Sequence, residues 1–378
     1  MSKWEMVRLG DVFPYIRNGA NLKQNKKVVG FPITRIESIS EGTINRNKMG
    51  YAGIMDLEPY SSFVLQEGDI LMSHINSATH LGKVARYTKR NEEKIIHGMN
   101  LLNLRTDDEK ATSRFAYYFF ISYGFKKQIP NITKHSVNQS SFNITALKDL
   151  WIPLPPLGVQ HKIANILDRA AALIEKRKAQ IARLDLLVKS QFVEMFGDPV
   201  INPMGWEQSK WKLLFDTTTG KLDSNAMDEN GIYPFFTCAK EVYTINDYAF
   251  DCEALLLAGN NASAIYDVKH YSGKFNAYQR TYVLTLKNNQ HSYHLFKLML
   301  EQKLEQMRVL SKGTNTKYLT MGILNDFDFI CPPHELQHQF ANFVRQTEKL
   351  KAQMKQRLRK LKLLYKSLMQ KYFKGDLA

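Results

Sequence analysis

Two stretches of this chain repeat one another: residues 147–196 read LKDLWIPLPPLGVQHKIANILDRAAALIEKRKAQIARLDLLVKSQFVEMF, and residues 324–373 read LNDFDFICPPHELQHQFANFVRQTEKLKAQMKQRLRKLKLLYKSLMQKYF. They align at a constant offset of 177 residues, so that Gln160-His161 falls on Gln337-His338. A region of similar length but different sequence precedes each copy. A repeat this long exceeds a solenoid unit of about 20–50 residues, so it indicates the duplication of a whole domain.

Each repeated segment is predicted to form one long helix. A diproline, Pro155-Pro156 or Pro332-Pro333, precedes it and presets the helix entry. Apolar residues then recur at heptad spacing, which is typical of a coiled coil. We assign the a and d positions to Ile163, Ile166, Ala170, Leu173, Leu184 and Leu187, extended by Leu167, Ile174, Ile181, Val188 and Met195, and in the second copy to Phe340, Phe343, Leu350, Met354, Leu361, Leu364 and Leu368.

The two variable regions are predicted to be mixed α/β domains of one fold. Asp69–Ser73 and Glu253–Ala258 are strand-like runs at corresponding places, and Ser113–Lys127 and His291–Met307 have helical length. A symmetric duplication would relate the halves by a pseudo-twofold axis and pack the long helices antiparallel, with the domains at opposite ends. We therefore expect an α/β protein in which two mixed α/β domains are separated by an antiparallel pair of coiled-coil helices, with boundaries at 1–153, 154–197, 198–330 and 331–378.

The composition indicates a folded protein with a polyanionic partner. The 378 residues suffice for two or three domains, and 44% of them are hydrophobic. The formal net charge of +16 favours nucleic acid or an acidic membrane surface as the partner, although a basic protein without such a partner remains an alternative. No run of 18 apolar residues is present, and the N-terminus is charged where a signal peptide is apolar.

Motifs for catalysis and for metal binding are missing from the sequence. The three cysteines, Cys238, Cys252 and Cys331, lie far apart, which argues against a zinc site and fits a reducing cytoplasm. No glycine-rich nucleotide or methyl-donor loop is present, and Asn202-Pro203-Met204 lacks the second proline and the aromatic residue of an amino-methyltransferase tetrapeptide. We therefore expect a subunit without catalytic activity, without a metal and without a cofactor of its own.

Several motifs resemble one family. They are Ile152–His161 (IPLPPLGVQH) leading into a long helix, Phe196–Glu207 (FGDPVINPMGWE) leading into the second variable region, Glu67–Ser73 and Gly273–Val283. In this order the chain is similar to the specificity (S) subunits of type I restriction–modification enzymes, over nearly its whole length. The resemblance implies two target recognition domains, each reading one half of a bipartite, asymmetric DNA sequence, with the helices setting the gap. It also implies docking of two methyltransferase (M) subunits and, where present, motor-nuclease (R) subunits, which would bind S-adenosylmethionine, ATP and magnesium.

Base edges are read by Arg, Lys, Asn and Gln side chains, so polar loops beside the strands are the predicted contacts with double-stranded DNA. Two further loops, at 134–138 and 311–315, align with each other, and we expect phosphate contacts there. The alternative for each residue is an ordinary turn or surface charge. The predicted DNA-binding residues are Asn18, Lys23, Arg35, His74, Asn76, Lys83, Lys134 and Asn138 in the first domain, and Asn260, Asn261, Lys274, Tyr278, Gln279, Arg280, Lys312 and Asn315 in the second.

The sequence allows two roles for the polar residues at the helix starts and for the charged residues along the helix. Gln160, His161, Gln337 and His338 either cap the helices or bind the methyltransferase. The many lysines and arginines between Lys349 and Lys366 form a solvated face or, second, a partner contact. A coiled-coil scaffold with incidental nucleic-acid affinity and a self-sufficient DNA enzyme are the competing functions.

Overall fold

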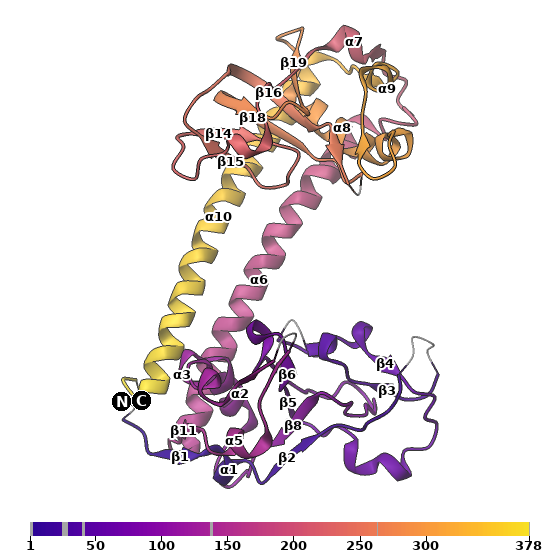
Figure 1. Ribbon diagram of the computed structural model, residues 1–378. Helices are drawn as coiled ribbons and strands as arrows, with labels where there is room; N and C mark the ends of the chain where they lie inside the picture. Colours follow the sequence, from indigo (N-terminus) through magenta and orange to yellow (C-terminus); the bar gives the residue numbers. More distant parts are fainter. Residues whose placement is uncertain (1–2, 25–28, 40–41, 137–138, 263, 378) are drawn as a thin grey trace. The chain divides into compact units, whose positions relative to one another are not determined.

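The computed structural model describes residues 3–24, 29–39, 42–136, 139–262 and 264–377. The chain divides into two compact units, Met1–Arg177 with Arg357–Ala378, and Lys178–Gln356. Each unit contains one α/β domain and part of each of two long helices, α6 (Leu157–Phe196) and α10 (His334–Lys374), whose labels are given in Figure 1.

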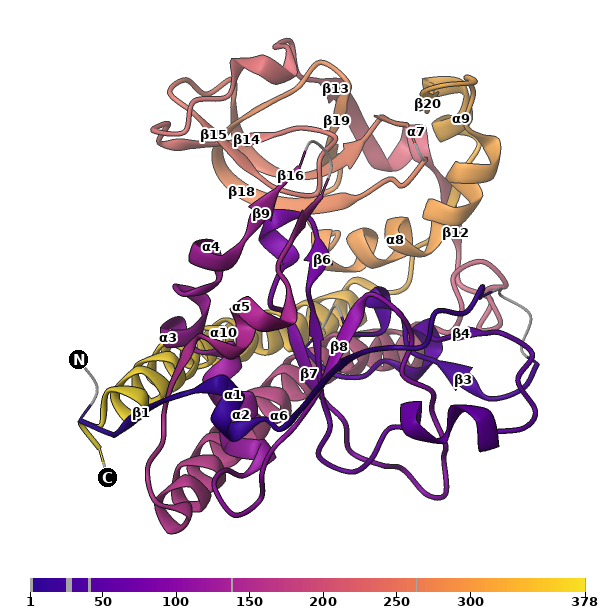
Figure 2. The ribbon, with the colours of Figure 1, turned by 60° about the horizontal axis from the view of Figure 1, so that its bottom comes forward.

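The first domain is built on a four-stranded antiparallel sheet in the order β2-β8-β5-β7. The central strands β5 (Ile70–Ser73) and β8 (Leu101–Arg105) are almost wholly buried. Helix α2 (Ser113–Ile121) packs against β7 and is capped by the Thr112 side chain, which accepts from the Phe115 amide. The other elements, visible from a second side in Figure 2, are β1 (Met6–Arg8), α1 (Leu9–Val12), β2 (Tyr15–Asn18), β3 (Pro32–Ile33), β4 (Gly50–Tyr51), β6 (Ile75–Asn76), β7 (Val84–Arg86), α3 (Tyr123–Lys126), α4 (Ile129–Ile132), β9 (Lys134–His135), β10 (Ser140–Ser141), α5 (Ile144–Lys148), β11 (Trp151–Pro153) and the 3-10 turns Ile36–Ile39, Arg46–Lys48, Glu58–Phe63 and Ala78–His80.

The second domain carries a six-stranded sheet in the order β13-β19-β16-β18-β14-β15. Its longest strands, β16 (Phe250–Ala258) and β18 (Val268–Ala277), pair antiparallel, and α8 (Tyr293–Leu310) packs on them. Ser292 caps α8 by accepting from the Leu295 amide. The other elements are β12 (Gln208–Lys210), α7 (Trp211–Leu214), β13 (Phe215–Thr219), β14 (Tyr233–Phe236), β15 (Tyr243–Ile245), β17 (Asn260–Asn261), β19 (Thr281–Leu286), β20 (Lys317–Tyr318), α9 (Met321–Asn325), β21 (Asp328–Ile330) and the 3-10 turn Ser224–Ala226.

The two domains share one plan, as predicted. The order β2-β8-β5-β7 recurs as β13-β19-β16-β18, and the outer pair β1-β11 recurs as β12-β21. The start of each domain is tied to the end of a long helix in the same way. The Trp4 indole donates to the Tyr372 carbonyl at the end of α10, and the Trp206 indole donates to the Phe196 carbonyl at the end of α6, at 2.9 and 3.0 Å. The predicted mixed α/β class is confirmed.

Within each unit the long helices run antiparallel. In the first unit the start of α6 shares a core with the end of α10, since Ile163 and Leu167 lie in one cluster with Met369 and Tyr372. In the second unit the end of α6 packs on the start of α10, where the Phe192 and Phe340 rings are 5.8 Å apart. The antiparallel packing predicted from the duplication is therefore confirmed.

Part of our heptad assignment was wrong. Ile166, Leu173, Leu187, Leu350 and Leu364 are 39–57% exposed and do not line the helix interface. The buried and half-buried residues follow another heptad register, which the two copies share at the 177-residue offset. It consists of Gln160, Ile163, Leu167, Ala170, Ile174, Arg177, Ile181, Leu184, Val188, Gln191 and Met195 in α6, and of Gln337, Phe340, Val344, Thr347, Lys351, Met354, Leu358, Leu361, Tyr365, Leu368 and Tyr372 in α10.

Candidate nucleic-acid interface

One end of the first sheet brings several predicted residues together. Leu102 of β8 pairs with Asn18 on one side and with Met72 on the other, so Asn18 lies at the same end as the residues that follow β5. There Asn76 of β6 pairs with Ser140, and Lys134 of β9 pairs with Ser141 on the same small sheet. Lys83 joins this end because its carbonyl accepts from the Ser73 amide at 2.9 Å. Asn138 lies outside the described residues.

The second domain repeats this arrangement. Asn261 of β17 pairs with Lys317 as Asn76 pairs with Ser140, and residues 140 and 317 correspond at the 177-residue offset. Asn260 pairs with Tyr318, and an isolated bridge joins Tyr318 to the exposed Lys312. Asn315 is exposed in the same loop. Lys317 and the 38% exposed Tyr318 were not predicted, although they continue the Lys312–Asn315 run.

Arg280 lies beside this small sheet, in the turn between β18 and β19. Its carbonyl accepts from the Gly259 amide at 2.8 Å, and Gly259 directly precedes Asn260. A Cβ on Gly259 would come within 2.4 Å of that carbonyl, so the close approach requires glycine. The Tyr278 and Gln279 amides hold the turn by donating to Phe236 and Leu222. The Arg280 side chain is exposed and makes no hydrogen bond or ion pair with the residues that the structure describes.

Other predicted contacts are placed differently. Lys274 is exposed in the middle of β18 with its ammonium 4.4 Å from the centre of the Tyr248 ring, six residues away from Arg280. Phe275, the next residue of β18, is fully buried in the domain core. Lys23 is exposed, and Arg35 is half-exposed and paired with Glu37 at 3.5 Å.

His74 is a core residue rather than a base reader. It is 7% exposed, and its ring lies edge-on to the Phe142 ring with the centroids 6.4 Å apart. Burial lowers its pKa to about 4, so the ring is neutral at pH 7. The fully buried His97 has a pKa lowered to about 4 for the same reason. Sequence alone does not distinguish such a histidine from one in an exposed loop.

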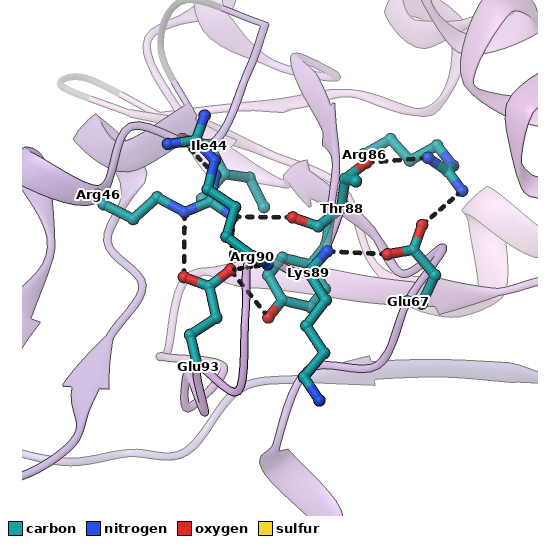
Figure 3. A network of polar contacts seen from close by, with 9 residues as sticks. Ile44, Arg46, Glu67, Arg86, Thr88, Lys89, Arg90 and Glu93 are labelled. Atoms are coloured by element: carbon teal, nitrogen blue, oxygen red, sulfur yellow. Dashed lines mark hydrogen bonds and ion pairs between the residues drawn. The ribbon is translucent and has the colours of Figure 1, made fainter.

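Several cations of the first domain are occupied by carboxylates (Figure 3). Arg46 pairs with Glu93 at 2.7 Å and donates to the Thr88 carbonyl, and Arg86 pairs with Glu67 at 3.0 Å. The guanidinium of Arg46 lowers the pKa of the Glu93 carboxyl. Burial, reinforced by Glu93, raises the pKa of the Tyr87 hydroxyl to about 12. These pairs stabilise the domain and reduce the positive charge available to DNA.

Gln160 and Gln337 do not have the exposed position that a partner contact needs. Both are fully buried and hydrogen-bonded within their own unit, so the prediction that they bind the methyltransferase is wrong. His161 and His338, one residue later, are exposed on the first turn of α6 and of α10. Among the described residues no cluster of His, Cys, Asp and Glu is arranged to hold a metal ion. The described helices include none with the length and apolar character needed to cross a membrane.

Comparison with known proteins identifies the family. The type I restriction modification DNA specificity domain (Methylase_S) matches residues 1–183 and 203–363. The chain therefore belongs to this family. In its fold it is similar to the S subunit of a type I restriction-modification system from M. genitalium, with a TM-score of 0.60 at 16% identity over 98% of this chain and 96% of that one. A second similar structure comes from work on complex assembly and conformational transition of the type I R-M system. Its TM-score is 0.56 at 18% identity, over 99% of this chain and 98% of that one.

Two sequence relatives are specificity subunits. The putative type I restriction enzyme MjaX specificity subunit of Methanocaldococcus jannaschii is 42% identical over 207 residues, 55% of this chain and 48% of that protein. The type I restriction enzyme EcoDI specificity subunit of Escherichia coli is 36% identical over 182 residues, 47% of this chain and 39% of that protein. The chain thus spans half or less of the length of these curated relatives.

Proposed function

We propose that this chain is the non-catalytic DNA specificity subunit of a type I restriction–modification complex, in which each α/β domain reads one half of a bipartite, asymmetric sequence. Family membership supports the DNA-binding role. The observation that carries the two-reader mechanism is the recurrence of Asn and Lys side chains at one end of both sheets, on the ladders β6-β10-β9 and β17-β20. Two similar scaffolds with different side chains suit two different half-sites. The proposal is tested by mapping the methylated adenines in cells that make this chain with its methyltransferase. A methylated motif that forms one uninterrupted block would contradict it.

Arg280 is the strongest candidate for a base contact. Its side chain is exposed, its backbone carbonyl is held by the amide of Gly259, the residue before Asn260, and an arginine guanidinium has the fork geometry that reads guanine in the major groove. We expect Arg280→Ala to cost about 1–3 kcal/mol of discrimination at one base pair of one half-site. Competition binding of the assembled complex to duplexes altered at each position of the mapped motif measures this. Lys212→Ala, which removes an exposed cation of α7 outside the predicted contacts, is the control. Equal weakening on every duplex by Arg280→Ala would show that Arg280 contacts phosphate.

The long helices are proposed to bind two methyltransferase subunits through a repeated apolar surface. The docking stripe comprises Ile166, Leu173 and Leu187 of α6 and the residues 177 positions later, Phe343, Leu350 and Leu364 of α10. Ile166, Leu173, Leu187, Leu350 and Leu364 are large, apolar and 39–57% exposed beside the helix interface. Exposed apolar patches mark protein interaction sites. A surface present twice fits two copies of one partner, which would supply S-adenosylmethionine chemistry, while ATP and magnesium belong to a motor-nuclease subunit.

A negative charge introduced into the docking stripe should prevent the methyltransferase subunits from binding. We expect Leu173→Glu combined with Leu350→Glu to abolish co-purification of the methyltransferase, because each introduces a carboxylate into an apolar contact at no large cost to the half-exposed helix. Ala179→Glu is the control, since six residues place it about 120° away around α6. Unchanged subunit ratios on a sizing column for the double variant would refute docking at this stripe.

A further inference from the structure

We propose that Gln160 and Gln337 are positioning residues that fix the angle between each recognition domain and its long helix, and thereby the fidelity of the gap between half-sites. This inference rests on the proposed function. Both side chains are fully buried on the first turn of a long helix, one in each unit. Neither side chain touches a candidate DNA contact. They would act through the rigidity of the joint, by which we mean the hydrogen bonds that connect the start of each long helix to its recognition domain.

The first joint is made of three hydrogen bonds from one amide group. Gln160 Nε2 donates to the Pro155 carbonyl and to the Lys110 carbonyl, each at 2.8 Å. Gln160 Oε1 accepts from the Thr112 amide at 2.9 Å. Thr112 is the cap of α2, so a single side chain ties the entry of α6 to the entry of the domain helix. All three partners are main-chain atoms, which makes the joint independent of the sequence that the domain carries.

The second joint repeats the first. Gln337 Nε2 donates to the Pro332 carbonyl at 2.8 Å, and Gln337 Oε1 accepts from the amide of Ser292, the cap of α8, at 3.1 Å. Its Nε2 also lies 3.2 Å from His291 Nδ1, which accepts in the neutral tautomer that carries its proton on Nε2. A buried amide with fixed partners on two elements tolerates little rotation, because every unpaired group would remain away from water.

The two joints differ in a second link between the long helix and the domain helix. In the first, Asp168 of α6 accepts from the Tyr118 hydroxyl and the Arg114 guanidinium of α2, which adds a second link about two turns further along the helix. The residue at the corresponding place in the second copy is Arg345, which donates to Asn342 of its own helix. The second domain should therefore depend more on its glutamine than the first.

Methionine at either position retains the size of the side chain and removes its hydrogen bonds. We expect Gln337→Met, in complex with the methyltransferase, to raise the share of methylated sites whose gap is one base pair too long or too short about tenfold, equivalent to about 1.4 kcal/mol of lost preference. Gln160→Met should have a smaller effect, and both half-site sequences should stay unchanged. If the methionine variants do not fold, Gln160→Glu and Gln337→Glu, which keep the acceptor for the Thr112 or Ser292 amide, are compared instead.

A merely structural role would lower stability without changing the gap. Leu71→Ala and Leu256→Ala, in the buried cores of the first and second domains, are the controls, compared at equal loss of Tm. A gap distribution that is as narrow in the glutamine variants as in these controls would overturn the inference. A wild-type chain that directs methylation to no bipartite motif would instead refute the proposed function itself.

Discussion

Exchanging residues 4–153 for the first recognition domain of another family member is expected to replace one half of the recognised sequence completely. The other half and the gap should not change, because the second domain and both long helices are untouched. Preference for the new half-site over the old one should exceed about 10³-fold, the usual margin between specific and non-specific binding. Methylation mapping of the exchanged chain with its methyltransferase measures all three features at once.

The junctions of this exchange follow from the structure. Trp4 is hydrogen-bonded to the end of α10, and residue 153 ends β11, which pairs with β1 inside the exchanged region. Gln160 bonds only main-chain atoms of the domain, so a foreign domain can form the same joint. The reciprocal exchange of residues 206–330 is the control and should replace the other half. If one exchange alters both halves, the domains do not read independently.

Lengthening both long helices by one heptad is expected to lengthen the gap by about three base pairs, since seven residues add about 10.5 Å and base pairs rise about 3.4 Å. The insertions belong after Arg177 and after Met354, which correspond at the 177-residue offset and lie on the shared interface. A heptad preserves the phase of that interface. Overall methylation should fall, because three base pairs also rotate the groove by about a third of a turn.

The matched control lengthens α6 alone. That insertion displaces every interface residue of α6 beyond it relative to α10, so we expect a lower Tm and loss of methylation at all gaps. Mapping of the methylated sites distinguishes the chain with both helices lengthened from the chain with α6 alone lengthened. An unchanged gap in the doubly extended chain, with methylation retained, would show that the helices do not set the spacing.

The sequence alone determined the duplication, the two long helices and the α/β class of the domains. These follow from local signals: a repeated segment, diprolines at the helix entries and apolar periodicity. The approximate strands at Asp69–Ser73 and Glu253–Ala258 were recognisable as runs of buried apolar residues, and the structure has them as Ile70–Ser73 and Phe250–Ala258. By contrast, the strand β18 (VKHYSGKFNA) was not predicted, because it is rich in polar residues. It is held in the sheet by pairing with β16 on one side and with β14 on the other.

Only the tertiary structure decided which face of each long helix is buried and what the polar candidates do. Both apolar stripes of α6 fit a heptad, and the interface took the one containing Leu167 and Ile174, because that face also meets the domain core. Gln160, Gln337 and His74 looked like surface polar residues and are buried, whereas Arg280 is exposed in a turn. A polar side chain can lie in water or, when its hydrogen bonds are made, in the interior, so its residue type does not determine where it lies. The contacts made by distant segments determine that.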